Sequence, residues 1–149
     1  MEDELQERLQ REELIVASVR KRAFSMFIDE MLLSLLLIIV LWDSFTSAQS
    51  TEEIIVLTNT FVLEFMIMKI VYQTFFTIQY GATLGKIIMK IRIIEVSTLS
   101  TPTFTSAFNR AVFRIISELF LYLGFLWGTM NPEHQTWHDK TARTLVVNA

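Results

Sequence analysis

Two long apolar segments constrain this chain more than any other feature of its sequence. They run from about residue 23 to 42 and from about residue 54 to 78. A helix rises about 1.5 Å per residue, so twenty residues cover roughly 30 Å, the thickness of the hydrocarbon core of a bilayer. Hydrophobic residues make up 52% of the chain and charged residues 19%, against about 45–50% and about 25% in soluble domains. The sequence therefore predicts an integral membrane protein with two transmembrane helices.

The positions of Lys and Arg predict how these segments are oriented. Three bases at residues 20–22 precede the first apolar segment, and Lys86, Lys90 and Arg92 follow the second. The loop between the segments, residues 43–53, contains no Lys or Arg. Because short cytoplasmic loops carry an excess of these residues, we expect a multi-pass protein with a cytoplasmic N-terminus. The loop 43–53 would then lie outside.

The last third of the chain predicts two short strands and a third helical segment. Residues 87–96 and 144–147 are rich in β-branched side chains, as is typical of strands. Residues 104–130 suit a helix that follows Thr101 as a cap and breaks near Gly124. We therefore expect a small cytoplasmic two-stranded β element beside this helical segment.

If the two strands pair, this decides whether residues 104–130 cross the membrane. Both strands would then lie on one side of the membrane, and Lys140 and Arg143 favour the cytoplasm. We expect an interfacial or re-entrant helical pair, and a third span with the C-terminus outside is the alternative. The predicted fold class is membrane all-α, with two transmembrane helices and a third helical segment that re-enters or spans.

Residues 1–19 differ in character from the rest of the chain. Leu5, Leu9 and Ile15 form a thin apolar stripe among Glu, Gln and Arg, which is typical of an amphipathic helix. We expect a cytoplasmic N-terminal helix that is solvated, lies on a surface or binds a partner. Residues 20–149 would form the membrane domain.

Composition argues against several functional classes. A net charge of -3 lacks the basic surface that nucleic-acid binding needs. The chain contains no Cys, and His134, His138 and Asp139 are too few ligands to predict a metal site. It also shows neither a phosphate-binding loop nor a nucleophile elbow. We expect no enzymatic activity, no metal and no cofactor.

Ionisable residues inside or beside the apolar segments are the candidate functional residues. A charge at the centre of a bilayer costs about 2.5–3.5 kcal/mol, so such residues normally face a protein interior or a wet cavity and form pairs. A carboxylate in a low-dielectric site can also exchange a proton near neutral pH. The residues concerned are Asp29, Glu30, Glu64, Lys69, Arg114 and Glu118.

Helical spacing limits how Asp29 can be paired. Arg22 lies seven residues before it, which is too far for a direct contact along one helix. Asp29 therefore needs a partner from another helix, and Arg110 and Arg114 are the candidates. Such a pair would lock helices together; the alternative is that Asp29 serves as a coupling or ligand site.

The third helical segment and the second apolar segment add further candidates. Arg110, Arg114 and Glu118 follow one another at intervals of four residues and so share one helix face. Glu64 and Lys69 are five residues apart, a poor orientation for a pair within one helix. A structural role between helices and a role in transport both remain open for them.

Four motifs follow one another along the chain. Residues 22–29 begin with Arg and end with Asp, and residues 81–86 contain Thr-Leu-Gly-Lys ahead of a predicted strand. Residues 108–114 carry two arginines, and residues 137–147 contain His-Asp ahead of the final strand. In this order they resemble the RDD family of small bacterial membrane proteins, named for one arginine and two aspartates. The resemblance covers about residues 20–147.

The resemblance implies a protein of the bacterial cytoplasmic (inner) membrane, with Arg22, Asp29 and Asp139 as the characteristic residues of the family. Most members are uncharacterised; transport is suspected, and some resemble cation/proton antiporters. It gives no further indication of a substrate.

From these observations we expect a small transporter of a cation or other solute with proton coupling through Asp29, Glu64 and Glu118. We expect it to act as a homo-oligomer in the lipid bilayer. The alternative is a non-catalytic accessory or assembly subunit of a larger membrane complex. The residues expected to serve ion or proton coupling, or pairing between helices, are Arg22, Asp29, Glu64, Lys69, Arg110, Arg114, Glu118 and Asp139.

Overall fold

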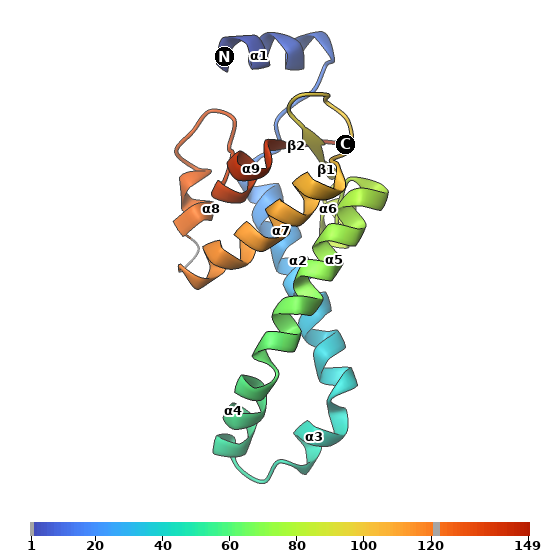
Figure 1. The fold of residues 1–149 in the computed structure, drawn as a ribbon, viewed down its shortest axis with the longest axis vertical. Coiled ribbons are helices and arrows are strands. Elements are labelled where there is room, and N and C mark those ends of the chain that lie inside the picture. The colour runs from blue at the N-terminus through green and yellow to red at the C-terminus, as the bar shows by residue number, and fades with distance from the viewer. Residues whose placement is uncertain (1, 121–122) are drawn as a thin grey trace.

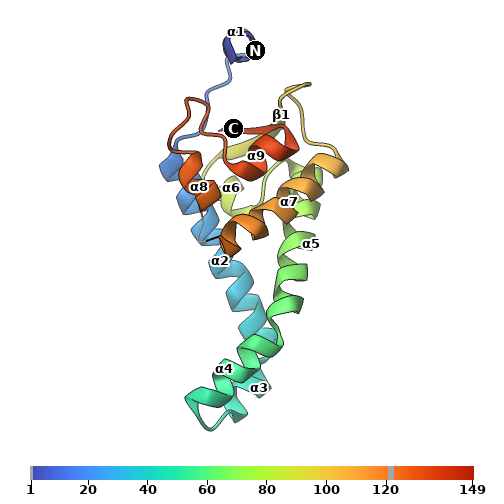
Figure 2. The same ribbon diagram turned by 60° about the vertical axis from the view of Figure 1, so that its left-hand side comes forward.

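The computed structural model describes residues 2–120 and 123–149, which are mostly helical and include one two-stranded antiparallel sheet (Figure 1). Both termini lie at one end of the molecule, with the sheet and helices α6 to α9, while α2 and α5 lead away to α3 and α4 at the other end (Figures 1 and 2). The elements are α1 Glu2–Arg11, α2 Val19–Val40, α3 Trp42–Ser47, α4 Thr51–Thr60, α5 Val62–Tyr80, α6 Leu84–Ile88, β1 Ile91–Glu95, α7 Phe104–Leu119, α8 Leu123–Trp127, α9 Trp137–Ala142 and β2 Thr144–Asn148.

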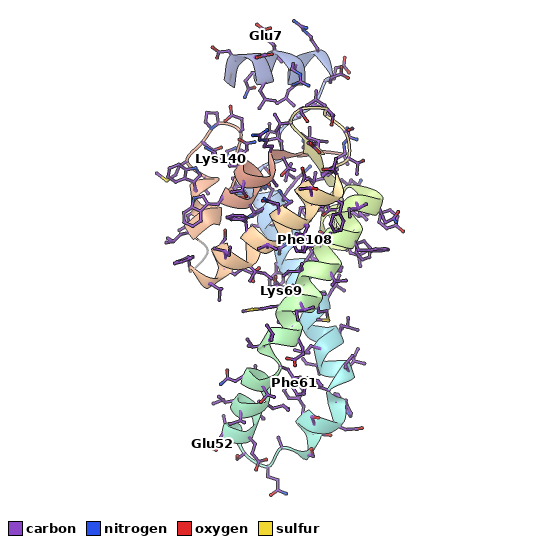
Figure 3. The ribbon with its side chains drawn as sticks, viewed as in Figure 1. Glu7, Glu52, Phe61, Lys69, Phe108 and Lys140 are labelled. Carbon is purple, nitrogen blue, oxygen red and sulfur yellow. The ribbon has the colours of Figure 1, made fainter. Side chains whose placement is uncertain are left out.

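The first apolar segment forms α2, whose first turn is capped by the Ser18 side chain accepting from the Lys21 amide. Among the described residues, α2 is the one helix that alone is long and apolar enough to cross a membrane. The second predicted segment, 54–78, is not one straight helix. It is divided between α4 and α5, which meet that condition only together and are bent by 50° at Phe61 (Figure 3).

The helices bury polar side chains and expose apolar ones. The buried residues of α5 are Lys69, Gln73, Thr74 and Thr77. On α2, large apolar side chains such as Phe27 are exposed. A protein folding in water does the reverse, because apolar surface leaves water and charges stay in it. The pattern suits a chain whose helices are surrounded by lipid.

The two predicted strands pair, which confirms the β element. β1 and β2 are antiparallel, with Ile91 opposite Asn148 and Glu95 opposite Thr144. The first residues of the predicted strand 87–96 are helical instead, because α6 extends to Ile88. Thr83 precedes α6 in the extended conformation of an N-cap, and this turn prevails over the β preference of the isoleucines that follow.

The N-terminal helix is shorter than its sequence pattern predicts. α1 ends at Arg11, and the chain then runs in extended form along β2, with the Ala17 amide donating to the Val146 carbonyl at 2.9 Å. Leu9 of α1 is buried against Ile94 and Leu145 of the sheet. Leu5 and Leu9 of the predicted apolar stripe therefore cover the sheet, whereas Ile15 is exposed.

The third helical segment forms two helices, α7 and α8. α7 begins after Thr103, whose side chain accepts from the Ser106 amide, so Thr103 and not Thr101 is the cap. α7 ends at Leu119 and α8 starts at Leu123, so Gly124 lies inside α8. α7 lies across the molecule from α2 to α5 in both views (Figures 1 and 2).

The approach of α6 to α2 leads to a prediction at Gly85. A Cβ atom there would collide with the Ser25 carbonyl oxygen and lie 2.8 Å from Asp29 Oδ1. We expect Gly85→Ala to destabilise the protein by about 1–3 kcal/mol, because the backbone of α2 would have to shift. Thermal unfolding in detergent measures the loss. Ser34→Ala on the exposed side of α2 is the control; equal melting temperatures for both variants would contradict the prediction.

Candidate functional site

Asp29 lies on the buried side of α2 and accepts hydrogen bonds from three neutral donors. Its Oδ1 accepts from the Tyr72 hydroxyl at 2.7 Å and from the Gly85 amide at 2.8 Å, and its Oδ2 accepts from the Thr83 hydroxyl at 2.6 Å. The carboxylate has no exposed surface. It therefore caps the start of α6 while holding α5 and α6 against α2.

Lys86 stands near this carboxylate without displacing its neutral donors. Lys86 is buried one residue after Gly85. Burial lowers the pKa of Lys86 well below its ordinary value, and the Asp29 charge opposes this shift. Tyr72 joins Asp29 to the turn a second time, because its hydroxyl accepts from the Leu84 amide at 3.1 Å.

Asp139 occupies a second buried position, between two arginines. Arg22 of α2 and Arg110 of α7 both form ion pairs with its carboxylate. Asp139 also closes a capping box at the start of α9, where the Thr136 amide donates to Oδ2 at 3.0 Å and the Thr136 hydroxyl at 2.9 Å. Arg110 donates further to the Thr144 hydroxyl at 3.0 Å. This triad, Arg22–Asp139–Arg110, joins α2, α7, α9 and β2.

Arg22 contacts Asp139, which lies 117 residues later in the sequence. This contact joins the first apolar helix to the C-terminal part of the chain. The sequence model of the RDD family matches residues 16–143, a range that contains both residues. The chain belongs to the RDD family. No curated protein and no solved structure matches it.

In this RDD protein, the three characteristic residues suggested by the sequence fall into two places. Arg22 and Asp139 are in direct contact, and Asp29 lies seven residues further along α2 in the separate cradle of Tyr72, Thr83 and Gly85. Family membership places the protein among membrane proteins of unclear function. The ion pair of Arg22 with Asp139 and the hydrogen bonds of Asp29 therefore connect helices, and neither contact by itself indicates a reaction or a substrate.

A third group, the ring of Glu30, Lys69, Arg114 and Glu118, alternates acids and bases across α2, α5 and α7. Lys69 Nζ lies 2.9 Å from Glu30 Oε1 and 2.5 Å from Glu118 Oε2. Arg114 lies 3.4 Å from Glu30 and 3.5 Å from Glu118. The side chains of Glu30 and Glu118 are 26% and 15% exposed, whereas those of the two aspartates in the cradle and the triad are fully buried. Among these three buried groups, the ring is thus the one whose carboxylates a solute can reach.

Polar atoms next to the ring have unused hydrogen-bonding capacity. Within the described residues, Gln73 Nε2 and Thr74 Oγ1 of α5 are buried with no hydrogen-bond partner, as is Glu118 Oε1. Buried polar atoms normally have partners, so such a group calls for an explanation.

The structure corrects the predicted partners of Asp29. Arg110 pairs with Asp139, and Arg114 pairs with the two glutamates of the ring, so neither supplies the hydrogen bonds of Asp29. Lys69 pairs with Glu30 of α2 and Glu118 of α7, and so with other helices. Glu64 is exposed on α5, one turn and more from this ring.

Several site residues were not identified from the sequence. Tyr72, Thr83 and Gly85 are uncharged, and no spacing rule links them to Asp29. The Thr136–Asp139 capping box did carry a signal, because Thr followed three residues later by an acid is typical of a helix start.

His134, His138 and Asp139 are the side chains to consider as metal ligands in the sequence. Among residues 2–120 and 123–149, no group of three or more His, Cys, Asp or Glu could hold a metal ion. Burial lowers the pKa of His138 well below its ordinary value, and Arg110 and Arg22 lower it further, so this imidazole is neutral at neutral pH. Its Nε2 lies 2.9 Å from the Thr136 hydroxyl.

The triad leads to a prediction about stability. Asp139→Asn keeps an oxygen for the Thr136 donors but removes the charge that Arg22 and Arg110 share. We expect a loss of about 3–5 kcal/mol, because two buried guanidinium groups would lose their counter-charge. Thermal unfolding in detergent would show it.

A double variant separates the charge effect from the loss of a cap. Asp139→Asn with Arg110→Gln removes one guanidinium as well, so part of the lost stability should return. Lys140→Gln, at the exposed neighbouring position, is the control and should melt as the native protein does. No recovery in the double variant would show that charge balance is not what holds the triad.

Proposed function

We propose that this RDD protein crosses the bacterial inner membrane with α2 and with the bent pair α4–α5, and has both termini in the cytoplasm. The antiparallel pairing of β1 with β2 supports this topology, since it brings the C-terminus beside the segment that follows α5. The bases at residues 20–22 and 86–92 favour the same side. α7 and α8 would then lie in the cytoplasmic half of the bilayer.

The burial pattern of α7 supports its placement in the bilayer. Arg110 and Arg114 face inward, whereas Phe104 and Phe108 stack on each other at 6.0 Å between ring centres and are exposed (Figure 3). An exposed aromatic face suits the boundary between headgroups and acyl chains.

We propose that the protein transports a small cation or other solute with proton coupling, and that the ring of Glu30, Lys69, Arg114 and Glu118 is the coupling site. The observation that carries this proposal is the sharing of Lys69 between two partly exposed glutamates. Protonation of one glutamate, or its binding of a cation, would leave Lys69 paired with the other. One glutamate could therefore take up and release a proton or a cation while Lys69 keeps a counter-ion.

Asp29 and Glu64 have smaller parts in this proposal than the sequence suggests. The hydrogen bonds of Asp29 connect three helices, which favours its role as a lock. Glu64 is exposed outside the ring. We keep a homo-oligomer in the proposal because α2 and α5 alone enclose little room for a solute path.

An accessory or assembly subunit of a larger membrane complex is the second candidate. The observation in its favour is α1, which has Glu4 and Glu7 exposed while Leu9 holds it against the sheet (Figure 3). A helix with a free charged face is suited to contact with a partner.

The topology is tested by cysteine labelling, for which the chain is well suited because it contains no Cys. Asn148→Cys should react with a membrane-impermeant maleimide only after the cells are opened. Gln49→Cys, in the loop between α3 and α4, should react in intact cells. Labelling of residue 148 from outside would contradict the proposed topology.

The coupling site is tested in proteoliposomes with a pH-sensitive dye inside. We expect a Na⁺ or K⁺ gradient to drive proton movement, and Glu118→Gln to reduce it to the level of empty liposomes. The reason is that Glu30 would then be the last counter-ion of Lys69 and Arg114 in the ring and could no longer give up its charge. Glu64→Gln is the matched control and should retain the activity.

Two results would count against this assignment. One is a native protein that moves no more protons than empty liposomes do; together with a membrane protein that co-purifies in fixed ratio, it would favour the accessory role. The other is an equal loss in Glu64→Gln and Glu118→Gln.

A further inference from the structure

A groove of about 180 Å³ lies between the N-terminal half of α2 and α8. Val19, Ala23 and Met26 form one wall and Leu126 belongs to the other. Figure 2 shows α8 alongside this part of α2, at the end of the molecule that carries the sheet and both termini. An apolar cavity of about 150 Å³ accommodates a benzene-sized molecule, so this groove has room for a short stretch of hydrocarbon chain.

Positive charge lies beside the groove. Arg22 lines it and belongs to the triad, in which two guanidinium groups face one carboxylate. The triad therefore has one positive charge in excess. Lys21 and Arg20, one and two residues earlier, add two further charges on the first turn of α2, and Arg20 is exposed. An anion beside the groove would balance the excess.

The surroundings of the groove are apolar and exposed. Phe24 and Phe27 on α2, and Leu123, Leu126 and Trp127 on α8, are all at least 47% exposed. A soluble anion would gain nothing from these walls. A molecule with a phosphate at one end and a hydrocarbon chain at the other would use both the charges and the apolar lining.

We propose that this groove binds one anionic phospholipid of the cytoplasmic leaflet, with an acyl segment between α2 and α8 and the headgroup phosphate beside Arg20 and Arg22. The proposal rests on the membrane placement given above. Since Arg22 also pairs with Asp139, the lipid would lie next to the triad that joins α2 to α7, α9 and β2. Binding would stabilise this connection.

Trp127, between the groove residues Leu126 and Gly128, can report the lipid. The variant Trp42→Phe/Trp137→Phe leaves it as the only tryptophan. This protein is placed in vesicles of equal parts phosphatidylcholine and phosphatidylglycerol, in which one lipid or the other carries bromine on its acyl chains. We expect brominated phosphatidylglycerol to quench Trp127 more strongly than brominated phosphatidylcholine does.

Two variants separate the groove from general attraction to a charged surface. Ala23→Phe fills the groove, and Arg20→Gln removes an exposed charge beside it; each should abolish the preference. Arg92→Gln removes an exposed base that does not line the groove and should leave the preference unchanged. The variant Trp127→Phe/Trp137→Phe keeps Trp42 as the only tryptophan. Quenching of Trp42 then reports contact with lipid at the opposite end of α2.

The outcomes distinguish failure of the lipid site from failure of the membrane placement. Equal quenching of Trp127 by both lipids would overturn the lipid site and leave the membrane placement standing. A preference that survives Ala23→Phe would also overturn it, because surface charge alone would then explain the result. Absence of quenching at both Trp127 and Trp42 would instead contradict the membrane placement.

Discussion

A fully buried carboxylate must receive hydrogen bonds within the protein, and at Asp29 this requirement determines how three elements meet. The donors are Tyr72 of α5 and two groups of the turn that starts α6. The Gly85 amide can donate only because α6 approaches α2 so closely that no side chain fits between them. α6 then leads within three residues into β1, so the position of the sheet follows from the contact between Gly85 and Asp29.

The triad makes the corresponding connection for the C-terminal half. Asp139 is held by a base from α2 and a base from α7, and Arg110 also donates to Thr144, the first residue of β2. One strand of the sheet is therefore positioned from the cradle of Asp29 and the other from the triad. Their pairing joins the two buried aspartates through the sheet. This explains why α2, which supplies both Asp29 and Arg22, is the central element of the fold.

The sequence predicts the parts of this fold that follow from general rules, namely the free-energy cost of an unpaired charge in lipid and the strand preference of β-branched residues. Charge in an apolar segment must be paired, which identified Asp29 and Lys69 but also the exposed Glu64. β-branched runs identified both strands. The sequence does not predict partners, because Asp29 is satisfied by neutral groups whose approach depends on the turn at 81–85. The same turn makes Ile87 and Ile88 helical against their β preference. The bend at Phe61 has no Pro or Gly within α4 or α5 to predict it.

The two kinds of acid in this protein differ in what a change of charge would cost. Asp29 and Asp139 have no exposed surface, and each joins elements that are distant in the sequence, so neutralising either would weaken contacts on which the sheet depends. Glu30 and Glu118 keep some exposure and share both Lys69 and Arg114. One of them can lose its charge while each base keeps a counter-ion. A small membrane protein that exchanges protons or cations needs such a redundant group beside rigid ones, and for this reason we place the proposed coupling in the ring rather than at the aspartates.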